Sequence, residues 1–231
     1  MEEHVIKPVA YIHNGLKGKF GIPRQSNIVK DLVSEIVFAP GYRDPEALRG
    51  IEGFSHLWLI WCFSESVGHE KSPTVRPPRL GGNERMGVFA TRSPYRPNDL
   101  GLSCVKLLRR EKREHEGDVL IVAGADLMDG TPIFDIKPYL PYADGIADAS
   151  GGFAPDSGGE LAVRDDANRL SVYGEADRKT VLSLLARDPR PRYHDEPERI
   201  YGMTYGEYDV KFRVANGEVT VLEAIPAKKH K

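Results

Sequence analysis

Residues 56–63 read HLWLIWCF, and this continuous apolar run decides the fold class of the chain. The run is too short for most buried helices, so it predicts a strand that is covered on both faces. Further segments with strand character surround it, separated by glycine, proline and Asp-Gly turns. They are residues 5–12, 31–38, 87–91, 102–108, 119–127 and 131–136. Short strands at this spacing predict a mainly β protein with a single-sheet β-barrel in its N-terminal part.

Two local signals add detail to this part of the chain. Asp129-Gly130 lies between two apolar segments, and it predicts a β-hairpin that joins residues 119–127 to residues 131–136. Helical periodicity is scarce here, and residues 44–49 predict a single short helix.

A change of composition predicts how the chain is divided. Residues 143–160 are rich in Gly, Ala, Ser, Asp and Pro, which is typical of a linker. We therefore expect a β-barrel domain over 1–142, a linker over 143–164 and a small α+β domain over 165–231. Within the last domain, leucine and valine at helical spacing predict a helix over 175–186. Residues 208–214 and 218–225 predict a β-hairpin around Asn216-Gly217.

The charges are balanced overall but unevenly distributed. The 231 residues include 32 Lys and Arg against 34 Asp and Glu, and the formal net charge of −2 gives no sign of nucleic acid. Residues 74–98, however, contain five arginines, no lysine and one acid. Arginine alone in a loop-rich stretch suits bidentate pairing with phosphate or carboxylate, although a run of charges is also typical of a solvated surface.

Several classes of protein are excluded by missing motifs. No two of the 23 glycines stand two residues apart, so the G-x-G dinucleotide fingerprint is absent, and so is a P-loop. Neither H-E-x-x-H nor G-x-S-x-G occurs, and Cys62 and Cys104 form no C-x-x-C pair. We expect no metal and two buried free thiols. No apolar run approaches a bilayer span and no signal-peptide pattern opens the sequence, so we expect a cytoplasmic protein.

Three segments carry unusual chemistry. Residues 20–26 (FGIPRQS) place Arg24 and Gln25 in a loop stiffened by proline, although a plain surface loop is the alternative. Prolines also fix the backbone between the arginines of residues 76–98, which lowers the entropy lost on binding a ligand. Residues 127–141 place Asp135 among apolar neighbours, where an acid is costly unless it is used or is paired with Lys137 or an arginine.

The sequence resembles a known family at several places. The stretches are RPPRLGGNERMGVFATRSPYRPN followed by GLS, the earlier PRQ and FSHLW, DGTPIFDIKPYLP, and ARDPRP with YDVKFRV near the end. Together they are similar to the bacterial TrmO proteins, which are S-adenosylmethionine-dependent tRNA methyltransferases. The resemblance implies methylation of N6 of threonylcarbamoyladenosine at position 37 of threonine tRNA, a barrel instead of a Rossmann domain, and a homodimer whose interface helps to bind the cofactor. One departure is Asn27, where the family more usually has glycine.

The resemblance also implies roles for individual residues. Asp135 and Tyr139 are the expected catalytic residues, with Asp135 assigned to the cofactor or to proton removal. Aromatic faces for the sulfonium are expected from Phe89, Tyr95 or Tyr139, with core packing in a strand as the alternative for Phe89. The expected cofactor-binding residues are Pro23, Arg24, Gln25, His56, Arg85, Arg92, Asp129, Gly130, Thr131 and Pro132. The expected tRNA-binding residues are Arg76, Arg79, Arg92, Tyr95, Arg96, Asn98, Lys137 and Arg190.

Two other functions remain open at this point. The chain could be a non-catalytic module that binds S-adenosylmethionine or RNA and regulates another process. It could also be a methyltransferase of the same architecture that acts on a small molecule.

Overall fold

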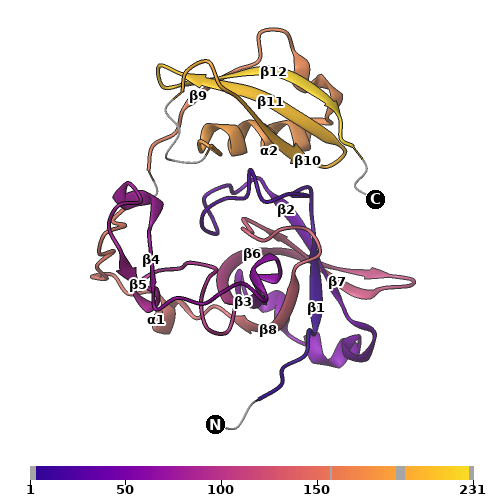
Figure 1. The fold of residues 1–231 in the computed structure, drawn as a ribbon. Coiled ribbons are helices and arrows are strands. Elements are labelled where there is room, and N and C mark those ends of the chain that lie inside the picture. The colour runs from indigo at the N-terminus through magenta and orange to yellow at the C-terminus, as the bar shows by residue number, and fades with distance from the viewer. Residues whose placement is uncertain (1–3, 157, 191–195, 229–231) are drawn as a thin grey trace.

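The computed structural model describes residues 4–156, 158–190 and 196–228, which form an N-terminal and a C-terminal part (Figure 1). The apolar run at residues 56–63 forms β3 (His56–Cys62). Leu57, Leu59 and Trp61 point into the core, whereas the alternate side chains are only half-buried. The expected strand is therefore present, but it is fully covered on one face only, as alternation along a strand in an antiparallel sheet dictates.

The N-terminal part is a single antiparallel sheet of six strands, which confirms the mainly β prediction. The strands are β1 (Ala10–His13), β2 (Val33–Phe38), β3, β6 (Leu100–Arg113), β7 (Gly117–Ala123) and β8 (Pro132–Pro138). Their hydrogen-bonded order is β1-β2-β7-β6-β3-β8, and pairing of β1 with β8 closes the sheet into a barrel. Closure leaves no open sheet edge and encloses one core, which includes Ile12, Ile36 and Leu120.

The prediction of a β-hairpin at Asp129-Gly130 is wrong. β7 pairs with β2 and β6, while β8 pairs with β1 and β3, so the two strands are not neighbours. The turn itself is real, with Gly130 at a φ of 77°. The main-chain amide of Gly130 donates to the carbonyl of Ile12 on β1. A turn signal is local, but the partner of each strand is set by closure of the whole sheet.

Of two further expectations for the N-terminal part, the short helix is confirmed and the strand is not. Residues 44–49 form a 3-10 helix, η2 (Pro45–Leu48), which begins with Pro45 and is capped by the Asp44 side chain. The strand expected at 87–91 is wrong. Only β5 (Met86–Gly87) is extended, paired with β4 (Thr74–Val75), and η6 (Val88–Ala90) follows it. Phe89 is 79% exposed, so the alternative of core packing is wrong as well.

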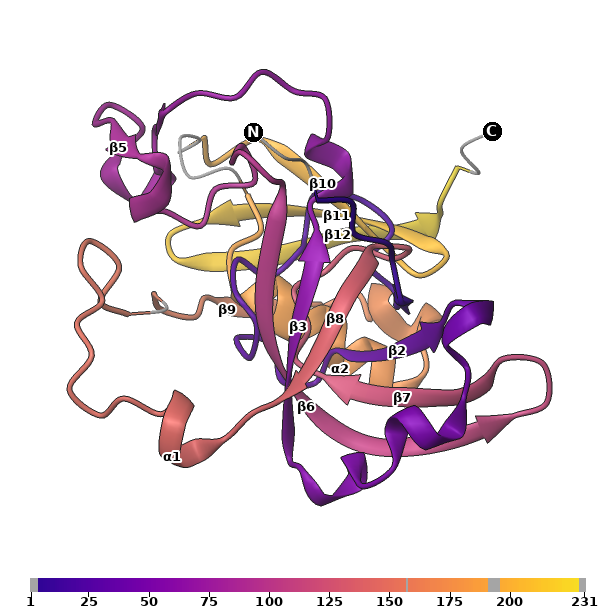
Figure 2. The same ribbon diagram turned by 90° about the horizontal axis from the view of Figure 1, so that it is seen from below.

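Short helices fill the connections between the strands. Residues 74–87, from β4 to β5, form an arm that extends from the sheet. The remaining elements are η1 (Pro40–Tyr42), η3 (Ile51–Gly53), η4 (Ser64–Ser66), η5 (Pro78–Leu80) and α1 (Pro141–Asp144). The β4–β5 pair lies on the arm, to one side of the closed sheet (Figures 1 and 2). The α1 helix covers part of the outer face of β3, where the Trp58 indole Nε1 donates to the Asp144 carboxylate at 3.0 Å.

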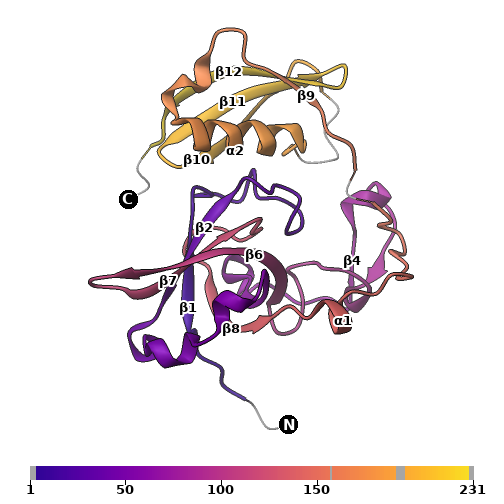
Figure 3. The same ribbon diagram turned by 180° about the vertical axis from the view of Figure 1, so that it is seen from behind.

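The C-terminal part contains one helix packed on one face of a four-stranded sheet (Figures 1 and 3). Its elements are β9 (Ala162–Arg164), η7 (Arg169–Val172), α2 (Glu175–Ala186), β10 (Ile200–Tyr205), β11 (Tyr208–Ala215) and β12 (Glu218–Pro226). The predicted helix and hairpin are both confirmed, with positive φ at Asn216 and Gly217 as a tight turn requires. β9 lies within the expected linker but pairs with β12.

The two parts meet at the loop between β1 and β2. Leu16, Val29 and Leu32 from this loop belong to the hydrophobic core of the C-terminal part, together with Leu185 of α2 and Phe212 of β11. α2 lies on the side of its sheet that faces the N-terminal part (Figure 3). Leu16, Val29 and Leu32 of the β1–β2 loop, residues 14–32, are therefore buried by the C-terminal part and not by the barrel core.

Close backbone contacts fix this junction. The Gly206 amide donates to the Gly15 carbonyl at 2.8 Å, and Leu16 forms a β-bridge with Tyr205. A Cβ atom at Gly15 would lie 2.5 Å from the Tyr205 ring, so only glycine fits there. On the other side of the loop, the Thr180 hydroxyl of α2 donates to the Asp31 carbonyl at 2.9 Å.

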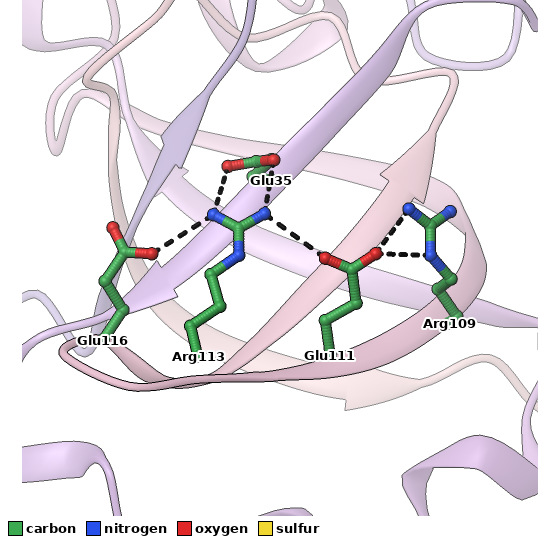
Figure 4. Close-up of polar contacts among 5 residues, drawn as sticks. All are labelled: Glu35, Arg109, Glu111, Arg113 and Glu116. Carbon is green, nitrogen blue, oxygen red and sulfur yellow. Dashed lines mark hydrogen bonds and ion pairs between the residues drawn. The ribbon is translucent and has the colours of Figure 1, made fainter.

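An ion-pair network joins the long β6–β7 hairpin to β2 (Figure 4). Arg113 donates to both carboxylate oxygens of Glu35, at 2.6 and 2.8 Å, and to Glu116 at 3.1 Å. Glu111 lies between Arg113 and Arg109 and contacts both. The Arg113 hydrogen bonds lower the pKa of Glu35. Since these side chains are partly exposed, we assign them a role in fixing the hairpin and only a small, salt-sensitive contribution to stability.

Within the described ranges, no helix has the length and apolar character needed to cross a membrane.

Replacing Leu16 should destabilise the junction strongly. Leu16→Ala removes a side chain that is 1% exposed, and we expect the free energy of unfolding to fall by about 2–5 kcal/mol because a cavity forms. Urea denaturation followed by circular dichroism measures this change. Val5→Ala, at a side chain that is 86% exposed, is the control and should change little. Equal effects of the two substitutions would contradict the assignment of the loop to the C-terminal core.

Candidate functional site

A cavity of about 250 Å³ lies where β3 ends. Four separate segments supply its walls: the β1–β2 loop, residues 61–66, residues 94–95 and residues 126–131. Trp61, Phe63 and Tyr95 provide aromatic surface, and Asp126 and Thr131 provide polar groups. Parts of the PRQ-containing loop, the arginine-rich segment and the DGTP segment thus converge at one end of the sheet, as expected for a small-molecule site.

The Trp61 ring is locked at the base of this cavity. Its indole Nε1 donates to the buried Ser103 hydroxyl at 2.9 Å, and its ring packs edge-on against Phe63 with centroids 4.3 Å apart. A Cβ atom at Gly101 would lie 2.3 Å from the Trp61 ring. Gly101 therefore allows the indole to lie flat across β6, and the ring position depends on the absence of a side chain there.

Asp126 continues the same hydrogen-bond network into the cavity. The Ser103 hydroxyl donates to Asp126 Oδ1 at 2.5 Å, so Trp61, Ser103 and Asp126 form a connected chain. Burial raises the pKa of Asp126 to about 6, even though Ser103, the Ser26 amide and the nearby Arg92 guanidinium favour the ionised form. A carboxyl group with this pKa in a cavity is typical of a functional site.

Arg92 contacts Gln25 of the PRQ segment, and its charge acts on Asp126, although neither Arg92 nor Gln25 lines the cavity. Asn27 fixes that segment: its amide donates to the Gly124 carbonyl at 2.8 Å, and its side chain donates to the Cys104 carbonyl at 3.0 Å. The φ of Asn27 is 62°, in the left-handed region that favours glycine and tolerates asparagine. Asparagine is one of the few residues other than glycine that adopt this conformation readily.

The Asp129 carboxylate is bound by neighbouring residues at the DGTP turn and does not line the cavity. Lys17 Nζ lies 2.7 Å from its carboxylate, and the Asn14 amide donates to it at 3.0 Å. Burial acts to raise the pKa of Asp129, but these hydrogen bonds outweigh it and the pKa is lowered. The expected cofactor-binding residues Gly130 and Thr131 lie on the same turn, and Thr131 lines the cavity.

The two expected catalytic residues lie elsewhere, on the outer face of β3 and β8. Asp135 is 50% exposed and forms an ion pair with Lys137 at 3.1 Å, the alternative that the sequence left open. It points away from the core because a β-bulge places Ile133 opposite the inward-facing Trp61 but Asp135 opposite Ile60, and this reverses the alternation that begins at the buried Ile133. Tyr139 packs against Trp58 and His56, at centroid distances of 5.8 and 6.2 Å. Neither Asp135 nor Tyr139 lines the cavity.

The remaining predicted arginines are divided between two places. Arg79 and Arg85 lie around the β4–β5 arm with Arg76. Arg85 donates to the Thr74 hydroxyl at 2.7 Å, and Arg79 contacts Asp156. Closer to the cavity, Arg96 donates to the Thr91 carbonyl at 3.1 Å.

The C-terminal part reaches the PRQ segment through residues 188–190. The Arg24 guanidinium lies 3.4 Å from the carbonyl oxygens of both Asp188 and Arg190. The Arg190 side chain pairs with Asp188 at 2.9 Å. Pro23 is buried next to Arg24, Pro132 begins β8, and Asn98 is exposed in the loop before β6. These expected ligands therefore do not all border one cavity.

Trp61, Ser103 and Asp126 were missed by the sequence analysis. Two signals could have pointed to them: Gly101 within an otherwise β-rich segment, which marks close approach of another group, and an acid directly after the apolar run VLIVAGA. Cys62 and Cys104, expected to be buried, are half-buried free thiols, and burial raises the pKa of each. The described residues contain no group of three or more His, Cys, Asp or Glu side chains that could hold a metal ion.

Two family models match the two parts of this chain. Residues 11–145 match the model of the tRNA-methyltransferase O N-terminal domain, and residues 162–227 match that of the TrmO C-terminal domain. The chain therefore belongs to the TrmO family, which confirms the resemblance seen in the sequence.

Individual relatives agree with this membership. The chain is 40% identical to a tRNA (adenine(37)-N6)-methyltransferase of Escherichia coli K12, over 96% of this chain and 99% of that protein. It is 41% identical to the "putative S-adenosylmethionine-dependent methyltransferase RcsF" of Pseudomonas aeruginosa, over 90% of this chain and 91% of that protein. The crystal structure of TrmO from Pseudomonas aeruginosa superposes with a TM-score of 0.78 at 32% identity, covering 96% of this chain and 98% of that one.

Gly101→Ala should displace the Trp61 ring. The added methyl group cannot occupy the space 2.3 Å from the indole, so the ring must move and its bond to Ser103 must weaken. We expect a changed tryptophan emission maximum and a free energy of unfolding lower by about 1–3 kcal/mol. Gly53→Ala, at a glycine with nothing within 4 Å of its Cβ position, is the control. Identical emission spectra for Gly101→Ala and the unchanged protein would contradict this packing.

Asp126→Asn should stabilise the protein at neutral pH but not in acid. The pKa of Asp126 is about 6 in the folded protein and near 3.8 in the unfolded chain, so the folded form binds more protons between pH 4 and 6. The free energy of unfolding attributable to this group therefore falls as pH rises through that range. We expect the variant to gain about 3 kcal/mol relative to the unchanged protein above pH 7 and little below pH 4.

Urea denaturation at several pH values measures this difference. Asp44→Asn, at the exposed cap of η2, is the matched control. A stability difference that is independent of pH would mean that Asp126 is not the buried acid that the structure shows.

Proposed function

We propose that this protein transfers the methyl group of S-adenosylmethionine to N6 of adenine 37 in tRNA, with threonylcarbamoyladenosine of threonine tRNA as the preferred substrate. The family membership and the names of its relatives support the reaction and the cofactor. The observation that carries the proposal is the cavity at the end of β3, which is lined by aromatic side chains and by a buried carboxylate whose ionised form the Arg92 guanidinium favours.

The residues at the cavity fit S-adenosylmethionine. This cofactor combines an adenine ring, a sulfonium cation and an amino acid, and it supplies an electrophilic methyl group when bound. Trp61 and Phe63 offer faces for a ring or a cation, and Asp126 offers negative charge. Thr131 adds a hydroxyl group, and Gln25 is held nearby through Arg92. We also retain the other expected cofactor residues of the PRQ and DGTP segments as part of this proposal.

A homodimer would complete the site. The cavity of about 250 Å³ is smaller than typical sites for whole ligands of this size, which supports a contribution from a second copy. Exposed apolar side chains close to the site, Phe89 at 79%, Leu102 at 56% and Tyr95 at 46%, are suited to such a contact. We therefore propose a homodimer that works on tRNA in the cytoplasm.

The rate of this reaction should depend mainly on how the reacting atoms are positioned. The N6 lone pair is delocalised into the purine and the carbamoyl carbonyl, so this nitrogen is a poor nucleophile and its proton must leave. A general base typically contributes about 10²- to 10⁴-fold, whereas alignment of the reacting atoms can supply up to about 7–11 kcal/mol. We keep Asp135 and Tyr139 as candidates for contact with the reacting groups, with access from the outer face of β3 and β8.

Arginine would select the modified nucleoside. Position 37 is an unpaired base in an anticodon loop, which can be splayed out and stacked on an aromatic side chain such as Tyr95. The threonyl group of this substrate carries a carboxylate, which Arg92 or Arg96 can pair. A site built for that carboxylate rejects unmodified adenosine, because a guanidinium would lose its partner. The arm arginines are candidates for phosphate contacts, so tRNA affinity should fall steeply with salt.

Methyl transfer to tRNA tests this function. Incubation with labelled S-adenosylmethionine and total tRNA, followed by nucleoside analysis, should place the label in the N6-methylated threonylcarbamoyl nucleoside. An unmodified transcript of the same tRNA should be a poor substrate. Arg92→Ala should lower kcat/KM for modified tRNA about 10- to 100-fold and reduce the preference over the transcript.

A control variant and two contrary outcomes complete this test. Arg109→Ala removes an exposed arginine of the β6–β7 hairpin and should leave both substrates unchanged. Label in a small molecule instead of tRNA would favour the small-molecule methyltransferase. Binding of cofactor and tRNA without any transfer would favour the regulatory module.

A further inference from the structure

Asp126 is a desolvated carboxylate whose charge the protein does not neutralise directly. Among the residues that the structure describes, no lysine, arginine or histidine nitrogen lies within 4.0 Å of its oxygens. The other two charged groups of the cavity wall, Lys19 and Glu65, form an ion pair with each other at 3.3 Å. Arg92 favours the ionised form from a distance, but its guanidinium contacts Gln25.

Neutral donors alone hold the Asp126 carboxylate. The Ser103 hydroxyl donates to Oδ1 at 2.5 Å, and the Ser26 amide also faces it. A buried charge without an ion-pair partner is costly, and the cost is relieved when a ligand supplies the opposite charge. The arrangement is therefore suited to a cationic ligand that enters the cavity.

The walls of the cavity select the kind of cation. Trp61, Phe63 and Tyr95 provide aromatic surface that attracts an organic cation with a diffuse charge. Among the described residues, no group of three or more His, Cys, Asp or Glu side chains that could hold a metal ion occurs at these walls. The Trp61 ring is fixed by Ser103 and by its packing over Gly101, so the surface is formed before the ligand arrives.

We propose that the Asp126 carboxylate is the anionic partner of the sulfonium centre of S-adenosylmethionine, and that it makes the site prefer this cofactor over its neutral demethylated product. The inference rests on the proposed function, because it needs the cofactor in this cavity. On methyl transfer the carbon–sulfur bond breaks, its electron pair stays on sulfur, a carbon–nitrogen bond forms, and the N6 proton leaves to a base. The product is then a neutral thioether, Asp126 loses its partner, and product release is favoured.

This pairing predicts proton release on binding. A cation next to Asp126 favours the ionised carboxylate. At pH 6 about half of the Asp126 carboxyl groups are protonated, so cofactor binding should expel up to about half a proton there, and above pH 8 almost none. The titratable and charged groups that face Asp126 across the cavity and could also respond are Lys19, Cys62, Glu65, Arg92 and Tyr95. A comparison of variants separates Asp126 from them.

Isothermal titration calorimetry of the full-length protein, in buffers of different ionisation enthalpy, measures affinity and proton release together. We expect Asp126→Asn to weaken S-adenosylmethionine binding about tenfold at pH 7.5, to change binding of S-adenosylhomocysteine less than threefold, and to abolish proton release at pH 6. Asp44→Asn, before β3 and at its opposite end from the cavity, is the matched control and should behave as the unchanged protein.

Ser103→Ala is the second variant, and it keeps the carboxylate. Loss of the Ser103 donor should move the midpoint of proton release to higher pH, so the inference can still fail if Asp126→Asn does not fold. Equal changes for both ligands in Asp126→Asn, or persistent proton release, would overturn it. Methyl transfer to tRNA by the unchanged protein would leave the proposed function standing in that case. Proton release without methyl transfer to tRNA would instead sustain the inference and refute the proposed function.

Discussion

The β1–β2 loop, residues 14–32, is held from two sides, and the rest of the structure depends on this. Leu16, Val29 and Leu32 are buried in the core of the C-terminal part. Asn27, later in the same loop, is bonded to the closed sheet, and Gln25 between these anchors contacts Arg92. The geometry of the cavity therefore depends on packing against residues more than 150 positions further along the chain, such as Leu185 and Tyr205. Hydrophobic burial that is remote from the cavity supplies the rigidity that the site needs.

Much of the fold could be predicted because its signals are local. The apolar run at 56–63, the helix at 175–186 and the Asn216-Gly217 hairpin each depend on patterns within a few residues. The hairpin at Asp129-Gly130 failed because closure of the sheet, a property of all six strands, decides which strands pair. The extended segment expected at 87–91 failed because local β character does not provide a partner strand.

The site was predicted only in part, for a related reason. Of the expected ligands, Tyr95 and Thr131 line the cavity, and Gln25 contacts Arg92. Asp126 belongs to no recognisable motif. Its raised pKa arises from burial, and the hydrogen bond that holds it comes from Ser103, a residue far away in sequence. Desolvation is a property of three-dimensional surroundings, so a pattern of residue types could not reveal it. Asp135 shows the converse, since a β-bulge in the pairing of β3 with β8 turns its side chain away from the core, and no local pattern in the sequence reveals that bulge.

The fit of Tyr205 against Gly15 has a consequence for the design of shortened proteins. A chain that ended before the linker would leave Leu16, Val29 and Leu32 facing water, and the Tyr205 ring that packs against Gly15 would be lost. Such an apolar strip is an aggregation hazard. A barrel designed to stand alone would need polar side chains at those three positions and a new brace for the segment carrying Gln25, so the two parts must be engineered as one unit.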